Sequence, residues 1–356
     1  MLSRAWMEVD LGGVVRNASS LAAVAQVPLI PMIKADAYGL GAVEVALALE
    51  SLDPLAYGIA TVAEGIELRA AGIDRPIVLF TPILQDEYGE AKGAGLTPSL
   101  ASSRDIESWA ADGHAYYLSI DTGMARAGVG WRDVGDVAAS VALHPPAAVY
   151  THFQSPGDMG KMAEQHRRFD EALDAFAKRP PVLHTDSSAA IVRHGRSRVS
   201  AVRPGIFLYG VGSGEDALCQ PESVVRVQAR IVDLRTVETG DTVSYEATWA
   251  APERSTIATL PIGYADGYPR GASNAGVAVV RGSMVKIAGR VTMDMIMLDV
   301  TGTGAGIGDV VTLIGDPRET GAPIDVASVA DFAALSPYEL LTGLRGRLTR
   351  IYRREL

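Results

Sequence analysis

The sequence predicts an α/β protein with two parts: an N-terminal (β/α)8 barrel in residues 1–220 and a mostly antiparallel β domain in residues 221–356. Two observations lead to this prediction. From about residue 27 to 205, short apolar runs alternate with longer amphipathic stretches, a pattern typical of parallel strands joined by helices. From Val224 onward, β-type runs separated by turn residues replace the helical stretches.

Eight apolar runs, bounded by proline or glycine, are the predicted barrel strands. In chain order they are VPLIPMIK, PLAYGIA, RPIVLF, LTPSL, AYYLSI, AAVYTHF, PVLHT and RVSAVR. Between them lie helix-like segments such as GAVEVALALESL, VAEGIELRAAG and MAEQHRRFDEALDAFAK. Eight units suggest a closed barrel. A doubly wound open sheet is the alternative, because periodicity counts units better than it shows whether they close.

Length, charge and cysteine content narrow the class of protein. A chain of 356 residues exceeds the size at which single cores stop growing, which favours two domains. The formal net charge is −10, and the chain has no basic tract that could bind a nucleic acid or an anionic membrane. Cys219 is alone and cannot form an internal disulfide, which fits a reducing cytosol. We therefore expect a cytoplasmic protein that binds neither nucleic acid nor membrane.

Polar residues fall where a barrel places its chemistry, at the C-terminal ends of the strands. Lys34 ends the first predicted strand with Tyr38 behind it, Arg126 follows the fifth, and His152 ends the sixth. The last two strands are followed by Ser187, Ser188, Arg203, Gly205 and Ile206. Small residues there suit backbone N–H groups that wrap an anion. A buried lysine facing that anion, beside other cations, is a competent Schiff-base nucleophile, which points to pyridoxal phosphate.

Each of these residues also has an ordinary structural interpretation. Lys34 could be a solvated rim residue, and the two serines could simply cap a helix. His152 and His184 could be core histidines, the interpretation we favour for His184. The arginines could be ion-paired at strand ends, and Gly205 could serve only a turn. A site is favoured because all of these residues fall at the same end of one predicted barrel.

The β domain adds two distinctive segments, LPIGYADGYPR at residues 260–270 and RVTMDMIMLDV at residues 290–300. The first places Tyr264 in a glycine-rich loop. Such a loop is usually a hairpin turn, but it could also present the Tyr264 hydroxyl to a neighbouring site. The chain has no GxxxxGK[ST], HExxH, CxxC or GxSxG motif. Its six histidines are scattered without ligand spacing, so the sequence predicts no metal site.

The motifs resemble those of the alanine racemase family, in order and across nearly the whole chain. They are KADAYGLG, DTGMARAG, THF, SSAA, VRPGIFLYG, PIGYADGYPR and VTMDMIMLDV. The lysine motif and the GYADGY motif at this separation form a highly specific pair. The resemblance implies a pyridoxal-phosphate isomerase that interconverts L- and D-alanine and so supplies D-alanine for cell-wall peptidoglycan. It also implies a head-to-tail homodimer with shared active sites.

The resemblance assigns roles to individual residues. Lys34 would hold the cofactor as an internal aldimine and act as the base on one face of the substrate. Tyr264 of the partner subunit would act on the opposite face. The remaining matches are Tyr38, Ser188, Gly205 and Ile206 at the phosphate, Arg203 and His152 at the pyridine ring, and Arg126, Met293 and Asp294 at the substrate carboxylate.

These assignments give a coherent mechanism. Racemisation needs two opposed acid–base groups, one for each face, and a lysine and a tyrosine supply them. An arginine cannot give up its proton, so Arg203 would leave the pyridine nitrogen unprotonated and favour reprotonation over decarboxylation or transamination. Two alternatives stay open. One is a racemase of broader specificity, acting for example on serine; the other is a barrel-type decarboxylase, which should lack the Tyr264 loop and carry an acidic group at that nitrogen.

The chain also departs from the family pattern. Leu40 stands where many members have a histidine, and Ser119 replaces a lysine that is carbamylated in many members and orients the arginine. Ser187 occupies a position often filled by asparagine, and Gly346 one where some members place a phosphate-contacting tyrosine. The segment THFQSPGDMG differs from the usual continuation. The two bases are unaffected, whereas the carboxylate contacts and the substrate range are left open.

Overall fold

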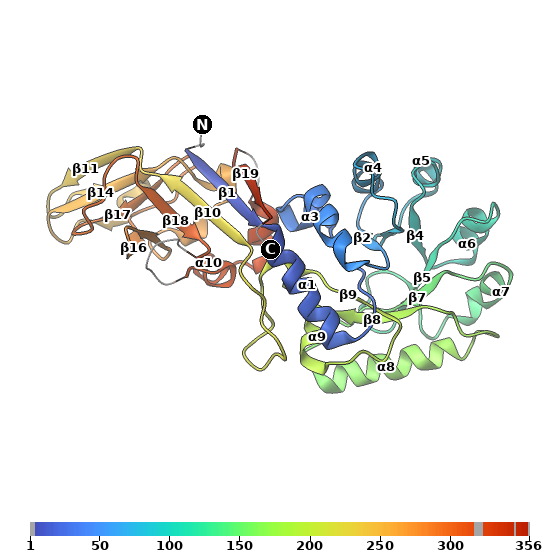
Figure 1. Cartoon of the computed structure of the whole chain (residues 1–356). Coiled ribbons are helices and arrows are strands. Elements are labelled where there is room, and N and C mark those ends of the chain that lie inside the picture. Colours follow the sequence, from blue (N-terminus) through green and yellow to red (C-terminus); the bar gives the residue numbers. More distant parts are fainter. Residues whose placement is uncertain (1–3, 317–322, 345–346, 355–356) are drawn as a thin grey trace.

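The computed structural model describes residues 4–316, 323–344 and 347–354. Its N-terminal part is built on parallel strands that pair in the order β2-β3-β4-β5-β7-β8-β9, with the short β6 beside β5. Their bounds are β2 Tyr57–Ile59, β3 Ile77–Leu79, β4 Thr97–Leu100, β5 Tyr117–Asp121, β6 Val129–Gly130, β7 Ala148–Tyr150, β8 Leu183–Ser187 and β9 Ala201–Arg203. Figure 1 shows them with helices arranged around the outside.

Residues 28–33 close this sheet into a barrel, although only two isolated bridges mark them. The bridges join Leu29 to Val202 of β9 and Met32 to Gly58 of β2, both in parallel. Pro28 and Pro31 have no backbone N–H to donate, which prevents a regular ladder along this segment. The segment therefore takes the place of the first predicted strand. The (β/α)8 barrel is confirmed, and the open-sheet alternative is wrong.

Helices surround the barrel except after its last strand. Their bounds are α1 Leu11–Ala25, α3 Ala42–Leu49, α4 Val62–Ala70, α5 Tyr88–Gly93, α6 Ser103–Ala110, α7 Gly135–Leu143, α8 Met159–Leu173 and α9 Ser188–His194. After β9 the chain forms only the 3-10 helix η3 (Ile206–Tyr209). Helix α1, which precedes the first barrel strand, packs against α3, α9 and η3 and covers that gap. No helix in the described parts of the chain is long and apolar enough to cross a membrane.

The second part is a nine-stranded sheet in the order β11-β14-β17-β16-β15-β18-β10-β1-β19. Its bounds are β1 Ala5–Asp10, β10 Val225–Arg230, β11 Asp233–Val237, β14 Ser255–Leu260, β15 Val277–Val280, β16 Ser283–Ile287, β17 Ile296–Asp299, β18 Val310–Ile314 and β19 Thr349–Arg353; β12 Thr242–Val243 and β13 Trp249–Ala250 form a separate hairpin. Two helices, α10 Val326–Ala333 and α11 Pro337–Gly343, complete it. The pairing is antiparallel except between β1 and β19, so the predicted mostly antiparallel domain is confirmed.

Strand β1 differs from the expected assignment of residues 1–220 to the barrel. It pairs with β10 and with β19, so residues 5–10 belong to the sheet of the second part. The first and the last strand in the sequence therefore lie side by side (Figure 1). The sequence of β1 predicts a strand, but its partners lie more than two hundred residues away, and a local pattern cannot indicate them.

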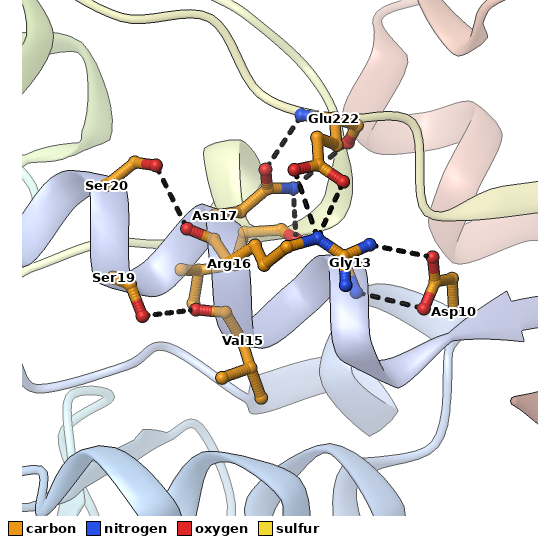
Figure 2. A network of polar contacts seen from close by, with 9 residues as sticks. Asp10, Gly13, Val15, Arg16, Asn17, Ser19, Ser20 and Glu222 are labelled. Atoms are coloured by element: carbon orange, nitrogen blue, oxygen red, sulfur yellow. Dashed lines mark hydrogen bonds and ion pairs between the residues drawn. The ribbon is translucent and has the colours of Figure 1, made fainter. Parts of the chain in front are cut away.

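Polar contacts fix the junction between the two parts (Figure 2). Asp10 caps α1 by accepting a hydrogen bond from the N–H of Gly13 at 2.9 Å. Arg16 forms ion pairs with Asp10 at 3.3 Å and with Glu222 of the connecting segment at 2.9 Å. The buried side chain of Asn17 donates to the Glu222 carbonyl and accepts from its N–H. Helix α1 of the barrel is thereby attached to the segment that leads into β10.

Candidate active site

The segment after Lys34 forms a left-handed helical turn. The short helix α2 (Lys34–Gly39) contains four consecutive residues with positive φ, at 52°, 57°, 51° and 57°. They are Ala35, Asp36, Ala37 and Tyr38. None is glycine, and each costs roughly 1–2 kcal/mol in this conformation because Cβ crowds the carbonyl. Such a turn persists only where its surroundings hold it, and strain of this kind concentrates at functional sites.

The C-terminal end of the chain packs directly on this turn. A Cβ on Gly39 would lie 2.5 Å from the carbonyl oxygen of Leu341, and one on Gly41 would overlap the hydroxyl of Tyr352. Arg350 of β19 forms an ion pair with Asp36 at 2.6 Å. The two glycines of the KADAYGLG motif are therefore required by the close approach of α11 and β19 as well as by their positive φ.

Lys34 lies among cations at the barrel mouth. Burial lowers the pKa of its amine, and the positive charges of Arg126 and Arg203 lower it further, while the carboxylate of Glu64 raises it. A lowered pKa increases the fraction of uncharged amine, the form that attacks a carbonyl carbon. The environment of Lys34 is therefore that of a nucleophilic amine and differs from that of a solvated rim residue.

Ser188, Gly205 and Tyr38 form a cradle of hydrogen-bonding groups that lines the same cavity as the lysine. The Ser188 hydroxyl accepts the N–H of Gly205 at 2.8 Å, so this serine links two loops and does not serve only as a helix cap. A Cβ on Gly205 would lie 2.5 Å from the hydroxyl oxygen of Tyr38, so only glycine lets them approach. Burial raises the pKa of Tyr38, which keeps its hydroxyl protonated as a donor. Ile206 follows at the start of η3. These groups fit an oxygen-rich anion such as a phosphate ester.

Arg203 is the buried centre of the barrel mouth, with 4% of its surface exposed. It donates to the Nδ1 and carbonyl oxygen of His184 at 2.5 and 2.9 Å. It also donates to the carbonyl oxygens of Thr151 and Thr185 at 2.7 and 3.1 Å, and to Nδ1 of His152 at 3.3 Å. Burial lowers the pKa of Arg203 to about 10, so the guanidinium keeps its charge at neutral pH.

The two histidines beside Arg203 are held neutral. Burial and the charge of Arg203, with smaller contributions from Arg126 and Lys34, lower the pKa of His152 to about 3. Burial and Arg203 also hold the pKa of His184 far below its usual range. Because a guanidinium can only donate, Nδ1 of each imidazole is the acceptor and the proton resides on Nε2. His184 is thus a core histidine, as favoured from the sequence, but one that also orients Arg203.

One cavity of about 890 Å³ joins these groups at the mouth of the barrel. Its lining includes Lys34, Tyr38, Arg126, His152, Ser187, Ser188, Arg203, Gly205 and Ile206, and also Ser119 and Tyr338. Arg126 is exposed in the loop between β5 and β6, where its charge is available to an anionic ligand. The residues predicted from the barrel strands, the lysine among them, therefore converge in one cavity.

The residues predicted from the β domain do not line this cavity. Tyr264 begins the 3-10 helix η5 (Tyr264–Asp266), and its side chain is 42% exposed; Met293 is 53% exposed. Backbone hydrogen bonds join the two segments, from the N–H of Tyr264 to the Thr292 carbonyl and from Ala265 to Met293, each at 3.0 Å. Tyr264, Met293 and Asp294 thus form a second, exposed group on another face of the chain.

Arg347 connects the two segments of that exposed group. It donates to both carboxylate oxygens of Asp266, at 2.9 and 3.0 Å, and lies 2.7 Å from Oδ1 of Asp294. Asp266 is itself buried and accepts the N–H of Gly263 at 2.9 Å. The loop that presents Tyr264 and the turn that presents Met293 are therefore joined by one guanidinium in addition to the two backbone hydrogen bonds.

The departures from the family pattern occupy different environments. Leu40 is fully buried in the hydrophobic core, where a histidine would need a buried partner. Ser119 is 6% exposed on β5. Ser187 occupies the N-cap position of α9 but makes no capping hydrogen bond through its side chain. Gly346 lies outside the described residues.

Sequence reasoning did not identify three polar groups of this region: Glu64, Arg347 and the orienting role of His184. Glu64 follows a threonine by three residues, the signature of a helix cap, which gave no indication of a second partner. Arg347 lies more than fifty residues from both of its partners. The inward position of His184 on β8 was the only available signal, and it is equally compatible with a packed core residue.

The fold and the cavity define a class of protein: a (β/α)8 barrel with a C-terminal β domain, carrying a lysine of lowered pKa, a cradle of hydrogen-bonding groups and a buried arginine at the barrel mouth. The chain belongs to the alanine racemase family. Residues 9–213 match the model described as "Alanine racemase, N-terminal domain", and residues 224–352 match "Alanine racemase, C-terminal domain". The resemblance stated from the motifs is confirmed.

Individual relatives are similar to this chain over nearly its whole length. The alanine racemase of Citrifermentans bemidjiense is 35% identical over 370 residues, covering 97% of each chain. The crystal structure of alanine racemase from E. faecalis has a TM-score of 0.92 at 25% identity and covers 98% of each chain. The alanine racemase of Bartonella henselae, with covalently bound pyridoxal phosphate, has a TM-score of 0.89 at 27% identity, covering 99% of this chain and 100% of that one.

Proposed function

We propose that the chain is an isomerase that interconverts L- and D-alanine with pyridoxal 5'-phosphate as its cofactor. The observation that carries this proposal is the pairing of Lys34, whose amine has a lowered pKa, with the anion cradle across the same cavity. Membership of the alanine racemase family supports the reaction and the cofactor.

The residues present suit this cofactor. Lys34 would hold its aldehyde carbon, the cradle of Tyr38, Ser188, Gly205 and Ile206 would hold its phosphate, and Arg203 with His152 would face its ring nitrogen. When bound, pyridoxal phosphate supplies a conjugated system that acidifies the α C–H of an amino acid joined to it. Arg203 keeps its own proton, because its pKa is about 10 and several acceptors hold it. Facing the ring nitrogen, it would leave that nitrogen unprotonated, which opposes the decarboxylase alternative.

Proton movement at the α carbon requires two bases on opposite faces, and the roles proposed for Lys34 and Tyr264 supply one each. Lys34 takes or returns the proton on one face. Tyr264 takes or returns it on the other, through its exposed hydroxyl. Arg126 binds the substrate carboxylate from the barrel side, and Met293 and Asp294 border it from the β-domain side.

These roles require that the exposed group of one subunit cover the cavity of another. Tyr264 and Met293 are 42% and 53% exposed and do not line the cavity of their own chain. A head-to-tail homodimer with two equivalent contacts of this kind would complete both sites at once. We propose that arrangement, and we expect the enzyme in the cytoplasm.

The test is chemical. The purified protein should be yellow, and borohydride should fix one cofactor per chain on the peptide that contains Lys34, as read by mass spectrometry. A chiral assay across the common amino acids, serine included, should show the fastest interconversion for alanine. A colourless protein without a bound aldehyde would overturn the proposal.

A further inference from the structure

Glu64 joins two neighbouring loops at the barrel mouth. It lies in the first turn of α4, where its N–H donates to the Thr61 hydroxyl at 3.3 Å. One carboxylate oxygen accepts the N–H groups of Ala60 and Thr61, at 2.7 and 3.2 Å. These contacts form a capping box, which needs only that one oxygen. The other oxygen accepts the N–H of Ala35 at 2.7 Å, in the loop after Lys34.

The contact with Ala35 falls at the first residue of the left-handed turn. The N–H of Ala35 belongs to the peptide unit that follows Lys34, so its direction fixes the backbone from which the lysine side chain extends. Asp36 anchors the far end of the turn by accepting the N–H of Ala42 at 2.8 Å. Glu64 is therefore the anchor closest to the amine, while Asp36 and Arg350 hold the turn further along the chain.

Glu64 carries the opposite charge to the two arginines that act on the lysine amine. The cations Arg126 and Arg203 lower the pKa of the amine, whereas the carboxylate of Glu64 raises it. The other titratable residues that line the cavity are Tyr38, Asp121, Tyr150, His152, Tyr338 and Glu339. A negative charge beside Ala35 thus stabilises the peptide N–H and partly offsets the positive charges nearby.

We propose that Glu64 is a positioning residue for Lys34, because its carboxylate fixes the first peptide unit of the left-handed turn and so directs the amine into the cavity. The proposal rests on the proposed role of Lys34 as the residue that holds the cofactor. It assigns Glu64 no contact with substrate. Its effect acts through the backbone of Ala35.

Three variants of the full-length holoenzyme test this role. Glu64→Gln replaces one acceptor oxygen by an NH2 group, so either Ala35 or the start of α4 loses its partner. Glu64→Asp keeps a negative charge in the first turn of α4 but is one methylene shorter, so it cannot span both loops. Glu87→Gln is the matched control: Glu87 reaches back in the same way, accepting the N–H of Leu84 at 2.7 Å, but in the loop after β3 and outside the cavity lining.

We expect cofactor release from Glu64→Gln and Glu64→Asp, followed by absorbance after dilution, to be at least about tenfold faster than from the wild type, the equivalent of one lost charge-assisted contact. The kcat for alanine should fall by about tenfold while KM changes by less than about threefold, since substrate contacts are intact. Glu87→Gln should match the wild type in the rate of cofactor release and in kcat for alanine. Melting temperatures, measured in parallel, should fall more in Glu64→Gln than in Glu87→Gln, because the amide oxygen that remains in Glu87→Gln can still accept the Leu84 N–H.

The inference is overturned if Glu64→Gln and Glu64→Asp release cofactor and turn over alanine as Glu87→Gln does, because Glu64 would then serve only as a helix cap. This outcome is distinct from failure of the proposed function. If the wild-type protein carries no aldehyde that borohydride fixes on Lys34, the proposed function itself fails before any variant is compared.

Discussion

The barrel mouth and the exposed face of the β domain contrast in how they hold their polar groups. In the barrel mouth, Ser188 and Arg203 are each 4% exposed and form hydrogen bonds with neighbouring loops and strands. On the β domain, Tyr264 and Met293 are about half exposed, and the segments behind them are held by Arg347. Burial sets the pKa values of the groups in the barrel mouth. The groups on the β domain are joined by hydrogen bonds and ion pairs but are exposed.

This difference separates two tasks of a single site. Burial in the barrel sets protonation states: it lowers the pKa values of Lys34 and His152 and keeps the Tyr38 hydroxyl protonated. The β domain supplies preorganised groups that become enclosed only when another surface covers them. We infer that cofactor binding depends on the barrel mouth together with α11 and β19, which pack on its lysine turn, whereas racemisation depends also on the exposed group of Tyr264 and Met293.

Removing the hydroxyl of Tyr264 separates these two tasks most strongly. Tyr264→Phe should retain the cofactor absorbance while racemisation falls by about a thousandfold, the usual size of an acid–base contribution. Exchange of the α proton in deuterated water should persist for one enantiomer and be lost for the other. Tyr268→Phe is the control from the same loop, because its buried hydroxyl has no hydrogen-bond partner among the described residues. Unchanged racemisation in Tyr264→Phe would remove the β domain from the chemistry.

The second prediction concerns the rigidity of the exposed face. Arg347→Gln should lower kcat by about tenfold, since Asp266 and Asp294 lose their common partner and only backbone hydrogen bonds then fix one segment against the other. Cofactor release should not change. Arg281→Gln, which removes an exposed ion pair with Asp309 elsewhere in the same domain, should leave kcat unchanged. A normal kcat in Arg347→Gln would show that this face does not need the tether.

Acid should lower the free energy of unfolding, because the buried histidines of the barrel are neutral in the folded protein. The pKa of His152 is about 3 in the folded protein and about 6.5 when unfolded, so its contribution is complete above pH 6.5 and is lost as the pH falls towards 3. Between pH 7 and pH 5 this residue alone should remove about 2 kcal/mol of the free energy of unfolding. Urea titrations at the two pH values measure the change. His152→Gln should show a smaller loss, and an equal loss would place the titration elsewhere.

The smallest effect concerns strain in the lysine turn. Ala35 has a φ of 52°, where glycine fits more easily, so Ala35→Gly should change the free energy of unfolding by less than about 0.5 kcal/mol or increase it. Ala22→Gly, in the right-handed interior of α1, should lower it by about 1 kcal/mol. Chemical denaturation compares the two. Equal losses would mean that the turn is not strained.

Local patterns predicted the strand–helix units of the barrel and which residues follow its strands, but not whether the sheet closes. The eight apolar runs and the rule that chemistry lies at strand ends placed Lys34, Arg203 and Gly205 at one mouth. The left-handed turn was not predicted, because its four strained residues carry no glycine and depend on contacts from α11 and β19. The pairing of β1 with β19 and the tether through Arg347 likewise depend on partners distant in sequence.

The central claim is that one subunit supplies the lysine and another supplies the tyrosine of each site. Mixing Lys34→Ala and Tyr264→Phe subunits, each inactive alone, under conditions of subunit exchange tests it directly. Half of the dimers formed at random would carry one intact site, so about a quarter of the wild-type activity should return. Recovery near that level is the predicted result. A mixture that stays as inactive as its parents, although mass spectrometry shows mixed dimers, would contradict the claim.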